Sequence, residues 1–437
     1  MNNVMRTFFC TLRISKAAKS IVSTLESKGF SAYLVGGCVR DTLLGKRIKD
    51  YDIATSATPN EVMDIFSDSV FFCIPVGAQF GTIALCHKDT KQQYEVTTFR
   101  TDGFYKDNRK PDTVAFINDI QQDLLRRDFS INALAYQVGR TSCIIDYVGG
   151  LKDLKKQKIV CVGNPNVRFN EDSLRILRAL RFSATLGFSI QKRTHKSLMQ
   201  NTQLLRNLSA ERIASELDKM LVGKDFVRVF KTYNDIFVFI FSKYCHISGL
   251  ASNEMQHIAK DLSRFKGLKE DILLCARWAC ILAFVEKHKN GGAGQILQCL
   301  KYPNAFAKKI LLFVRFYDVD IAIKQDRKLR IALKNLLREM GVEVASEFIA
   351  FKMRVMKKKH IVRLKKAFDV VSKECFNLQR LCIKGDDLSV LNLSGKQIGT
   401  MLEILLQEVI NDKCANQKEV LITRATKIIQ NGEHDWI

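Results

Sequence analysis

The chain of 437 residues has little proline and no long hydrophobic run. Its five prolines exclude a proline-rich linker and a collagen-like segment. Its longest unbroken apolar stretches are far shorter than the ~20 residues that cross a bilayer. With 47% hydrophobic and 26% charged residues, the composition also excludes a disordered chain. At ~150 residues per domain, the length suggests about three domains.

Cysteine and histidine lack the spacing of a disulfide scaffold or a zinc site. The 13 cysteines are odd in number and irregularly spaced, without a CxxC pair, and the seven histidines form no zinc-like cluster. We therefore predict reduced cysteines and a reducing compartment. The first 20 residues loosely resemble a transit peptide, but helical spacing over 14–28 leads directly into an expected strand, so we predict a cytoplasmic protein.

Acidic residues are too few to balance the basic ones. The chain has 69 Lys and Arg against 45 Asp and Glu, a net charge of +24. This surplus favours a polyanionic partner, and we expect nucleic acid rather than a membrane surface because no basic amphipathic anchor stands apart. The lysine-rich stretch at 352–366 could face that partner, although such runs are more often solvated faces.

The hydrophobic pattern changes near residue 150. Before it, short strands are predicted at 32–35, 51–54, 81–86 and 94–99. From residue 171 onward the apolar residues follow a helical period. The fold class predicted from this change is α+β, with a sheet-containing front and an all-α remainder.

Two glycines open the most informative segment, residues 32–55 (AYLVGGCVRDTLLGKRIKDYDIAT). Gly36 and Gly37 end an expected strand, and a helix should begin near Val39. At such a turn, backbone N–H groups and the helix N-terminus can approach a phosphate. By itself, a Gly-Gly turn is weak support for a phosphate site.

Two aspartates follow in the same segment. Asp50 and Asp52 flank Tyr51 at the head of the next strand, where side chains two apart share a face. Two carboxylates at this spacing suit Mg²⁺, which bridges triphosphate oxygens and activates an attacking hydroxyl. A bare Asp-x-Asp at a strand edge is more often a solvated pair. Glu95, on a neighbouring strand, could supply a third carboxylate.

Four charged residues recur every three positions further along the sequence: Asp172, Arg175, Arg178 and Arg181. We expect them on one helix with Asn170 as its N-cap. The ordinary interpretation is a salt-bridged polar face. However, a carboxylate accepts hydrogen bonds and a guanidinium donates them. One Asp and one Arg would therefore pair with cytosine and adenine, which offer an amino donor beside a ring-nitrogen acceptor, and would mismatch uracil and guanine.

These segments resemble the class II tRNA nucleotidyltransferases and bacterial poly(A) polymerases of the DNA polymerase β superfamily. Residues 32–55 resemble the start of the family's catalytic head. Five further segments follow in family order, resembling its flexible loop, ribose motif, turn into the neck, nucleobase motif and bracing helix: 100–116, 126–136, 146–154, 170–188 and 208–217. The resemblance covers residues 30–220, about half of the chain.

The resemblance implies an architecture and a set of site residues. It implies a nucleotidyltransferase head with a small mixed β-sheet (1–150), a nucleobase-recognising neck (151–235), a helical body (236–370) and a tRNA-binding helical tail (371–437). It implies that Asp50 and Asp52 are catalytic and hold Mg²⁺. The residues implied to bind the nucleotide are Gly37, Arg40, Arg127, Asp172, Arg175, Arg178 and Arg181.

The activity that the resemblance implies is template-independent addition of C, C and A to tRNA 3′ ends from CTP and ATP, with release of pyrophosphate. The implied partners are tRNA, CTP and ATP, with no membrane. Alternatives are an enzyme that adds only A or only CC, a poly(A) polymerase, and a non-catalytic RNA-binding protein. The last predicts lost metal carboxylates, but both are present.

Two segments favour a tRNA nucleotidyltransferase over a poly(A) polymerase, and a third favours the complete activity. Residues 73–85 are closer to the nucleotidyltransferase pattern, although Phe80 stands where a His often precedes Gly-Thr. Residues 382–410 resemble the nucleotidyltransferase tail. The loop at 100–111 is intact, whereas CC-adding relatives lack a working version. The one His-Asp dipeptide, His434-Asp435, has no supporting histidines, so a phosphohydrolase activity is not expected.

Overall fold

The computed structural model describes residues 5–103, 105–106, 110–111, 113–139, 141–319, 325–354, 356 and 358–431. The chain forms two compact units, Met1–His246 and Ile247–Ile437. The first contains the predicted head and neck, and the second contains most of the predicted body and the tail. Of the helices described, none is both long enough and apolar enough to span a membrane.

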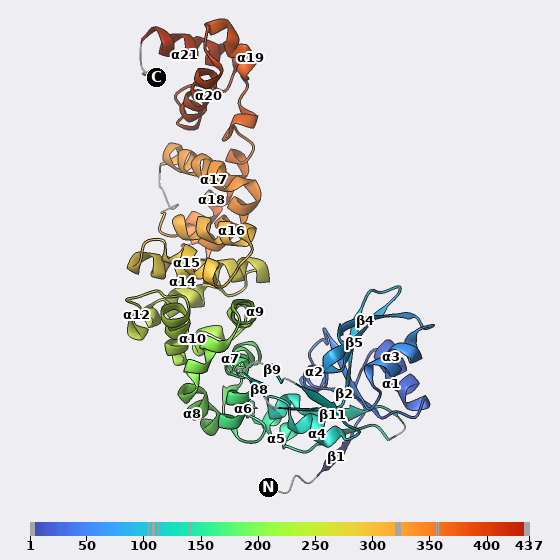
Figure 1. Cartoon of the computed structure of the whole chain (residues 1–437). Coiled ribbons are helices and arrows are strands. Elements are labelled where there is room, and N and C mark those ends of the chain that lie inside the picture. The colour runs from blue at the N-terminus through green and yellow to red at the C-terminus, as the bar shows by residue number, and fades with distance from the viewer. Residues whose placement is uncertain are drawn as a thin grey trace. The chain divides into compact units, whose positions relative to one another are not determined.

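An eight-stranded mixed sheet forms the centre of the first unit (Figure 1). All neighbouring strands are antiparallel except β3 and β6. In spatial order the strands are β1 (Arg6–Phe9), β12 (Cys143–Asp146), β11 (Leu134–Gln137), β2 (Ala32–Val35), β3 (Tyr51–Thr55), β6 (Gln93–Thr98), β5 (Thr82–His87) and β4 (Phe71–Gly77). The four strands predicted from the sequence, and the α+β class, are confirmed.

Alternating side chains build a core on each face of this sheet. Leu34 and Ile53 belong to one core with α1 (Lys16–Ser27) and α3 (Pro59–Phe66), which lie on the same side (Figure 1). Val35 and Ala54, one residue further along their strands, pack on the other face with α4 (Ile120–Leu125). This period of two is what strands covered on both faces require. Between β2 and β3 runs α2 (Gly37–Leu43).

A tight turn joins the sheet to the predicted neck. The Asp146 carboxylate, at the end of β12, is buried and accepts four backbone N–H groups. The donors, at 2.8–3.1 Å, are Val148, Gly149, Gly150 and Leu151. Helix α5 (Gly150–Lys155) begins there, and a Cβ on Gly150 would lie 2.2 Å from the Ser130 carbonyl oxygen. Only glycine fits this close backbone approach.

The neck begins with two short helices where one was expected. Helix α6 covers Pro165–Glu171 and α7 covers Leu174–Leu186, with Asp172 in an extended conformation between them (φ −135°, ψ 102°). The prediction that Asn170 caps a single helix carrying Asp172 was therefore wrong. The actual start is Asn164-Pro165, since the Asn164 side chain accepts from the Asn166 N–H and Pro165 needs no donor.

Four more helices follow α7 in the neck. They are α8 (Lys192–Gln200), α9 (Ala210–Leu221), α10 (Phe226–Thr232) and α11 (Asn234–Phe239). Helix α9 packs directly against α7, and their buried residues include Ile176, Leu180, Ile213 and Leu217. The polar side of α7 is therefore held toward the head. Four short strands, paired as β7 (Arg100–Asp102) with β10 (Val114–Phe116) and β13 (Lys158–Ile159) with β14 (Ser189–Ile190), complete the frame.

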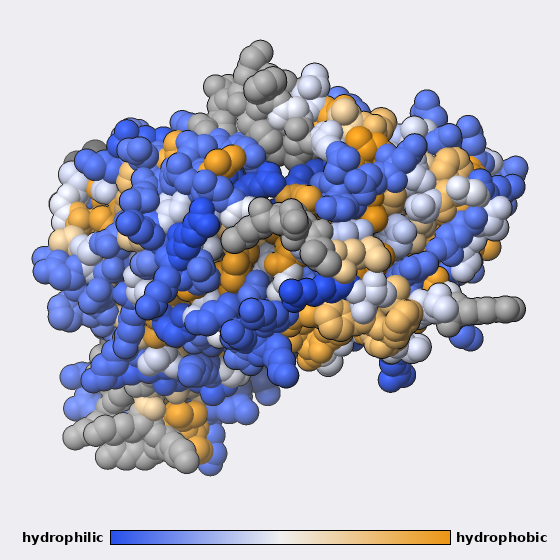
Figure 2. All heavy atoms as spheres, turned by 90° about the horizontal axis from the view of Figure 1, so that it is seen from below, coloured by the Kyte–Doolittle hydropathy of each residue, from blue (hydrophilic) through white to orange (hydrophobic). Residues whose placement is uncertain are grey.

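The second unit is helical throughout its described residues, as predicted. Its helices are α12 (Ser252–His257), α13 (Ala259–Leu262), α14 (Glu270–His288), α15 (Gly292–Cys299), α16 (Asn304–Arg315), α17 (Asp326–Met353), α18 (Lys358–Val371), α19 (Gly385–Leu388), α20 (Gly395–Ile410) and α21 (Lys418–Gln430). Residues from Cys375 to Ile428 form a core of their own. Hydrophilic residues cover much of the face in Figure 2. All 13 cysteines are free thiols, as predicted.

Candidate active site

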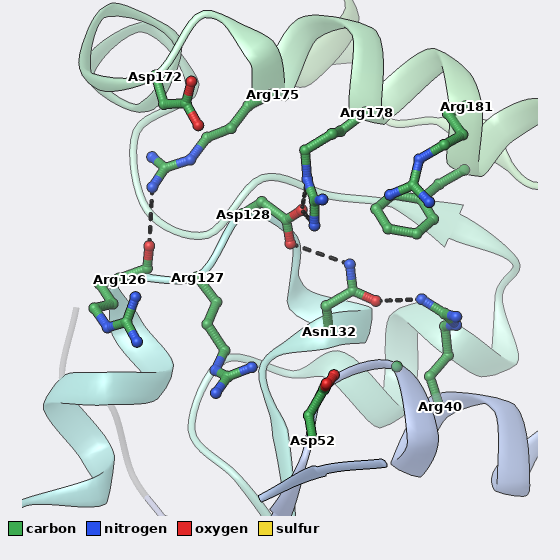
Figure 3. A pocket seen from close by; sticks show the side chains of 13 residues that line it. Arg40, Asp52, Arg126, Arg127, Asp128, Asn132, Asp172, Arg175, Arg178 and Arg181 are labelled. Carbon is green, nitrogen blue, oxygen red and sulfur yellow. Dashed lines mark hydrogen bonds and ion pairs between the residues drawn. The ribbon is translucent and has the colours of Figure 1, made fainter. Parts of the chain in front are cut away.

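A pocket of about 390 Å³ lies between the sheet and α7 (Figure 3). We call it the arginine-rich pocket, because six arginines line it together with carboxylates and small residues. Its lining residues are Gly36, Gly37, Arg40, Asp52, Arg126, Arg127, Asp128, Asn132, Asp172, Arg175, Arg178, Arg181 and Phe182. Eight of the nine predicted site residues are among them, and only Asp50 is not.

Asp52 is the carboxylate that β3 directs into this pocket. Burial raises its pKa to about 6, the Arg127 and Arg40 charges oppose that shift, and the Glu95 and Asp50 charges add to it. In the parallel β3–β6 pair, Asp52 lies opposite Glu95. Asp50 is exposed and stands directly before the strand. The two predicted carboxylates are thus neighbours, but one is in the pocket and the other lies outside its lining.

The donors near Asp52 fit a hard cation. Burial raises the pKa of Asp52 above its ordinary value, the charges of Glu95 and Asp50 raise it further, and an added cation would restore the charged form. Mg²⁺ is commonly bound through one or two carboxylates completed by substrate phosphates and water. Among the described residues, no group of three or more His, Cys, Asp or Glu could hold a metal ion. Glu95 as a third ligand therefore finds no support.

Gly36 gives the pocket its floor. It caps α2 with φ +71° and ψ −129°, a conformation that L side chains rarely adopt. A Cβ there would lie 3.1 Å from Arg127 Nη1 and 3.3 Å from Asp52 Oδ2. Glycine at this position therefore lets a guanidinium and a carboxylate converge on one backbone turn. Gly37, the residue predicted to bind nucleotide, follows it at the start of α2.

A chain of polar contacts links α2 to α7 across the pocket. Arg40 donates to Asn132 Oδ1 at 2.5 Å, and Asn132 donates to Asp128 Oδ1 at 3.1 Å. Asp128 is paired with Arg178, whose Nη2 is 2.6 Å from Oδ2. Figure 3 shows these four side chains in sequence from the lower to the upper wall. The predicted residues Arg40 and Arg178 are therefore held by Asp128 and Asn132.

The Phe182 ring organises the cations at one end of the pocket. The guanidinium carbons of Arg181, Arg40 and Arg178 lie 4.1, 5.2 and 5.4 Å from its centroid. Arg181 also forms an ion pair with Glu216 of α9, with 2.7 Å between Nε and Oε2. Burial lowers the pKa of Arg181 and the Arg178 charge lowers it further, while Glu216 raises it. Such crowded cations suit a ligand with several negative charges.

Arg127 lines the pocket beside Asp52. It shares the buried carboxylate of Asp123 with Arg126, at 3.0 and 2.6 Å. Burial would raise the pKa of Asp123, but the two guanidiniums lower it below its ordinary value. The Arg127 side chain is thus fixed beside Asp52 by a carboxylate from α4.

Asp172 and Arg175 come from the break between α6 and α7 and from the first turn of α7. Asp172 accepts from the Leu174 N–H at 3.2 Å and pairs with Arg212 at 3.2 Å. Arg175 is buried, donates to the Arg126 carbonyl at 3.1 Å and pairs with Glu171 at 2.8 Å. One acceptor and one donor therefore stand side by side, each positioned by its own partner (Figure 3).

Several residues that line the pocket or pair with its lining were not predicted from the sequence. Asp128 and Asn132 lie in the segment that resembles a ribose motif, so that motif was the available signal for them. Glu216 and Arg212 lie in the predicted bracing helix, but their partners are 35 and 40 residues away. Phe182 lies in the segment 170–188 that resembles the nucleobase motif, so that motif was its signal. Within the predicted flexible loop at 100–111, residues 104 and 107–109 lie outside the described residues.

Three family models match the chain. A Poly A polymerase head domain matches residues 32–160. A probable RNA and SrmB-binding site of polymerase A matches residues 187–235, and tRNA nucleotidyltransferase domain 2 matches residues 275–425. The matches follow one another along both compact units.

Full-length relatives and solved structures carry a consistent name. The CCA-adding enzyme of Lactococcus lactis subsp. lactis is 33% identical over 94% of this chain and 97% of its own length. That of Enterococcus faecalis is 34% identical over 96% and 97%. The Bacillus stearothermophilus CCA-adding enzyme in complex with CTP superposes with a TM-score of 0.76 at 27% identity, covering 95% of this chain and 98% of that one. The Thermotoga maritima CCA-adding enzyme complexed with tRNA shares the fold, with a TM-score of 0.63 at 19% identity over 95% and 97%.

Proposed function

We propose, since this chain belongs to the CCA-adding enzymes of the tRNA nucleotidyltransferase family, that it adds C, C and A to tRNA 3′ ends from CTP and ATP. The reaction needs no nucleic-acid template and releases pyrophosphate. The observation that carries the proposal is the arginine-rich pocket, where Asp52, clustered guanidiniums and the Asp172–Arg175 pair share about 390 Å³. A metal carboxylate, a polyphosphate site and a base-reading pair are the three parts that this reaction requires.

The guanidiniums hold the triphosphate in this proposal. Arg40, Arg178 and Arg181 surround the Phe182 ring, and Arg127 stands beside Asp52. Together they neutralise the charge that accumulates as pyrophosphate leaves. Gly37 and the N-terminus of α2 add backbone N–H donors at the same place. Asp128 and Asn132, linked to Arg40 and Arg178, offer polar atoms to the sugar.

Asp50 and Asp52 would hold Mg²⁺ at the reacting phosphate. A bound Mg²⁺ would supply Lewis-acid chemistry there, offsetting negative charge on the triphosphate and favouring ionisation of the attacking 3′-hydroxyl. The tRNA 3′-hydroxyl then attacks the α-phosphate in line with the departing pyrophosphate. Asp52 binds a cation in its ionised form. With a pKa of about 6, it is largely ionised above neutral pH even in the absence of metal.

Asp172 and Arg175 select the base. The Asp172 carboxylate accepts from the amino group of cytosine or adenine, and the Arg175 guanidinium donates to the adjacent ring nitrogen. Uracil and guanine present a carbonyl to the carboxylate, which repels it. The partners Arg212 and Glu171 keep both side chains in place.

The rest of the chain serves tRNA in this proposal. The head (1–150) performs the chemistry, the neck (151–235) selects the base, and the body (236–370) and tail (371–437) bind tRNA. The net charge of +24 supports a polyanionic substrate. The 13 free thiols support a reducing location, the cytoplasm.

The test uses tRNA transcripts that end at the discriminator base, at C and at CC, each incubated with one nucleoside triphosphate at a time. The proposal expects C on the first two transcripts, A on the third, and little U or G. A product limited to A identifies an A-adding enzyme, a product limited to C identifies a CC-adding enzyme, and long A tails identify a poly(A) polymerase. No product with any triphosphate, with RNA still bound, would leave an RNA-binding protein. Asp52→Asn is the matched inactive control.

A further inference from the structure

A second pocket, of about 620 Å³, lies in the head on the other side of β3. We call it the basic pocket. It is lined by Arg13, Lys46 and Arg47 and by no acidic residue; its other lining residues are Ile14, Ser15, Thr42, Gly45, Ile48 and Tyr51. It shares no residue with the arginine-rich pocket.

The three cations of the basic pocket are not neutralised within the described part of the chain. No ion pair between described residues includes Arg13, Lys46 or Arg47, and all three side chains are exposed. Elsewhere in the head, Arg40 is paired with Asp41 and Arg127 with Asp123. Burial lowers the pKa of Lys46, Asp41 opposes this, and the charges of Lys224 and Arg40 lower it further. The pocket therefore carries a positive potential.

The first turn of α1 adds to this potential. Ser15, the N-cap of α1, lines the basic pocket and accepts from the Ala18 N–H at 3.1 Å. The first turn contains no acidic residue and begins with Lys16. A helix N-terminus favours a negative charge, which this chain does not supply there.

The negative C-terminal end of the α2 dipole opposes this positive potential, but its carbonyl groups are largely hydrogen-bonded. Its C-terminal carbonyls also approach the basic pocket and would disfavour an anion. However, Leu44, Gly45 and Lys46 donate their N–H groups to the carbonyls of Arg40, Thr42 and Asp41 at 2.9–3.1 Å. Three formal charges and an open helix N-terminus therefore outweigh it.

The basic pocket is fixed next to the catalytic carboxylates. Tyr51, which lines it, is the residue between Asp50 and Asp52, and its hydroxyl accepts from the Ser15 N–H at 2.8 Å. Helix α2 contributes Arg40 to the arginine-rich pocket and Thr42 to the basic pocket. A strand that holds the chemistry on one face thus holds an anion-attracting surface on the other.

We propose that the basic pocket binds backbone phosphates of the tRNA acceptor strand, next to the 3′ nucleotide that is extended. The inference rests on the proposed function. Three anions meet this enzyme: nucleoside triphosphate, pyrophosphate and the RNA backbone. The first two carry clustered charge and are bound with Mg²⁺, whereas the basic pocket has no carboxylate to hold a metal. Phosphodiesters carry one charge each, and Lys and Arg can bind them without a metal ion.

The test compares Lys46→Gln/Arg47→Gln with the control Lys19→Gln/Lys28→Gln. Both double variants remove two positive charges from exposed residues of the head, and the control pair belongs to α1 and its C-cap. The basic-pocket variant should bind tRNA roughly tenfold more weakly at physiological salt, and the slope of log Kd against log salt should fall by about 1.4, ~0.7 per lost single-strand phosphate contact. KM for CTP should stay unchanged, and the control should match the wild type.

Two results would overturn the inference. One is a basic-pocket variant with wild-type tRNA affinity and salt slope. The other is a raised KM for CTP, or slowed pyrophosphorolysis at saturating tRNA, which would make the pocket a polyphosphate site. Arg13→Gln, in a different segment of the chain, is the second variant. It removes one charge instead of two, so the slope of log Kd against log salt should fall by about 0.7, half of the change expected for the double variant.

Chemically altered RNA locates the contact. Acceptor minihelices with one methylphosphonate at each terminal linkage remove one phosphate charge at a time. At the contacted linkage the wild type should lose affinity and the basic-pocket variant should lose none. Equal losses in both proteins at every linkage would reject the site. These experiments measure RNA binding and do not require nucleotide addition. A wild type that binds RNA but adds no nucleotide would therefore refute the proposed function and leave the phosphate site untouched.

Discussion

Arg178 of α7 and Asp128 of the segment after α4 form an ion pair, with 2.6 Å between Arg178 Nη2 and Asp128 Oδ2. The two residues are fifty positions apart in the chain. Asp128 is buried, which by itself would raise its pKa, but Arg178 and a hydrogen bond from Asn132 lower it below its ordinary value. This pair ties the neck helix to the head across the arginine-rich pocket.

Breaking that pair should destabilise the first unit. Asp128→Ala leaves the Arg178 guanidinium without its buried partner and should lower the free energy of unfolding by about 3–5 kcal/mol. Because the pKa values of Asp128 and Asp123 are lowered in the folded state, their stabilising effect is present above the ordinary carboxyl pKa and is lost as the pH falls below it. Urea unfolding between pH 3 and 7 measures both effects. Asp64→Ala, at an exposed position, is the control, and equal stability of the two variants would contradict the prediction.

Asp52 should have the opposite dependence. Its pKa is raised to about 6, so its contribution to stability is complete below the ordinary pKa and is lost as the pH rises through 6. Asp52→Asn should abolish nucleotide addition, leave tRNA binding nearly intact, and in metal-free buffer at pH 7.5 be more stable than the wild type. A rise of about 2 pKa units sets an upper limit of about 3 kcal/mol. The difference in stability between Asp52→Asn and the wild type should disappear toward pH 4. A variant less stable than the wild type at pH 7.5 would contradict this prediction.

Gly36 should be needed for activity more than for folding. Gly36→Ala places a Cβ 3.1 Å from Arg127 Nη1 and 3.3 Å from Asp52 Oδ2. Gly29 also has a positive φ (+89°), but a Cβ there would meet nothing within 4 Å. Both variants should lose roughly 1–2 kcal/mol of stability through the backbone, while only Gly36→Ala loses at least tenfold in kcat/KM. Similar activities in the two variants would contradict the role given to Gly36.

Asp172→Ala separates base reading from structure. Loss of a charge-assisted hydrogen bond should reduce kcat/KM for CTP and ATP by roughly 1–3 kcal/mol, while UTP loses much less, so discrimination narrows. Arg212→Met is the control, since it removes the partner of Asp172 and leaves the carboxylate in place. Unchanged selectivity with a lower melting temperature in Asp172→Ala would assign the residue a structural role only.

Shortening the segment 101–110 should separate the substeps. If this segment helps change the pocket from cytosine-sized to adenine-sized, deletion spares C addition and suppresses the terminal A. Single-turnover assays on transcripts ending at the discriminator and at CC measure the two steps. An equal loss of both would make the segment a general catalytic or folding element.

Local patterns predicted the elements, whereas long-range partners were not visible in the sequence. The strands predicted at 32–35 and 51–54 correspond to β2 and β3. The three-residue spacing of Arg175, Arg178 and Arg181 correctly predicted that all three lie on one helix, α7. The same spacing wrongly put Asp172 on that helix, because its side chain bonds the Leu174 N–H instead and its backbone is extended. The pairing of Asp128 with Arg178 could be located only from the folded structure, since the two residues are 50 positions apart in the chain.

The Asp146 turn restricts motion between the sheet and the neck. Four N–H donors and a glycine that tolerates no Cβ fix the passage from sheet to neck. Head and neck accordingly belong to one compact unit. An active site that must serve first one base and then a larger one cannot obtain the extra room by swinging at this joint. The adjustment falls to groups around the pocket: the rotamers of Asp172, Arg175 and their partners, and the segment 101–110, whose shortening should suppress the terminal A.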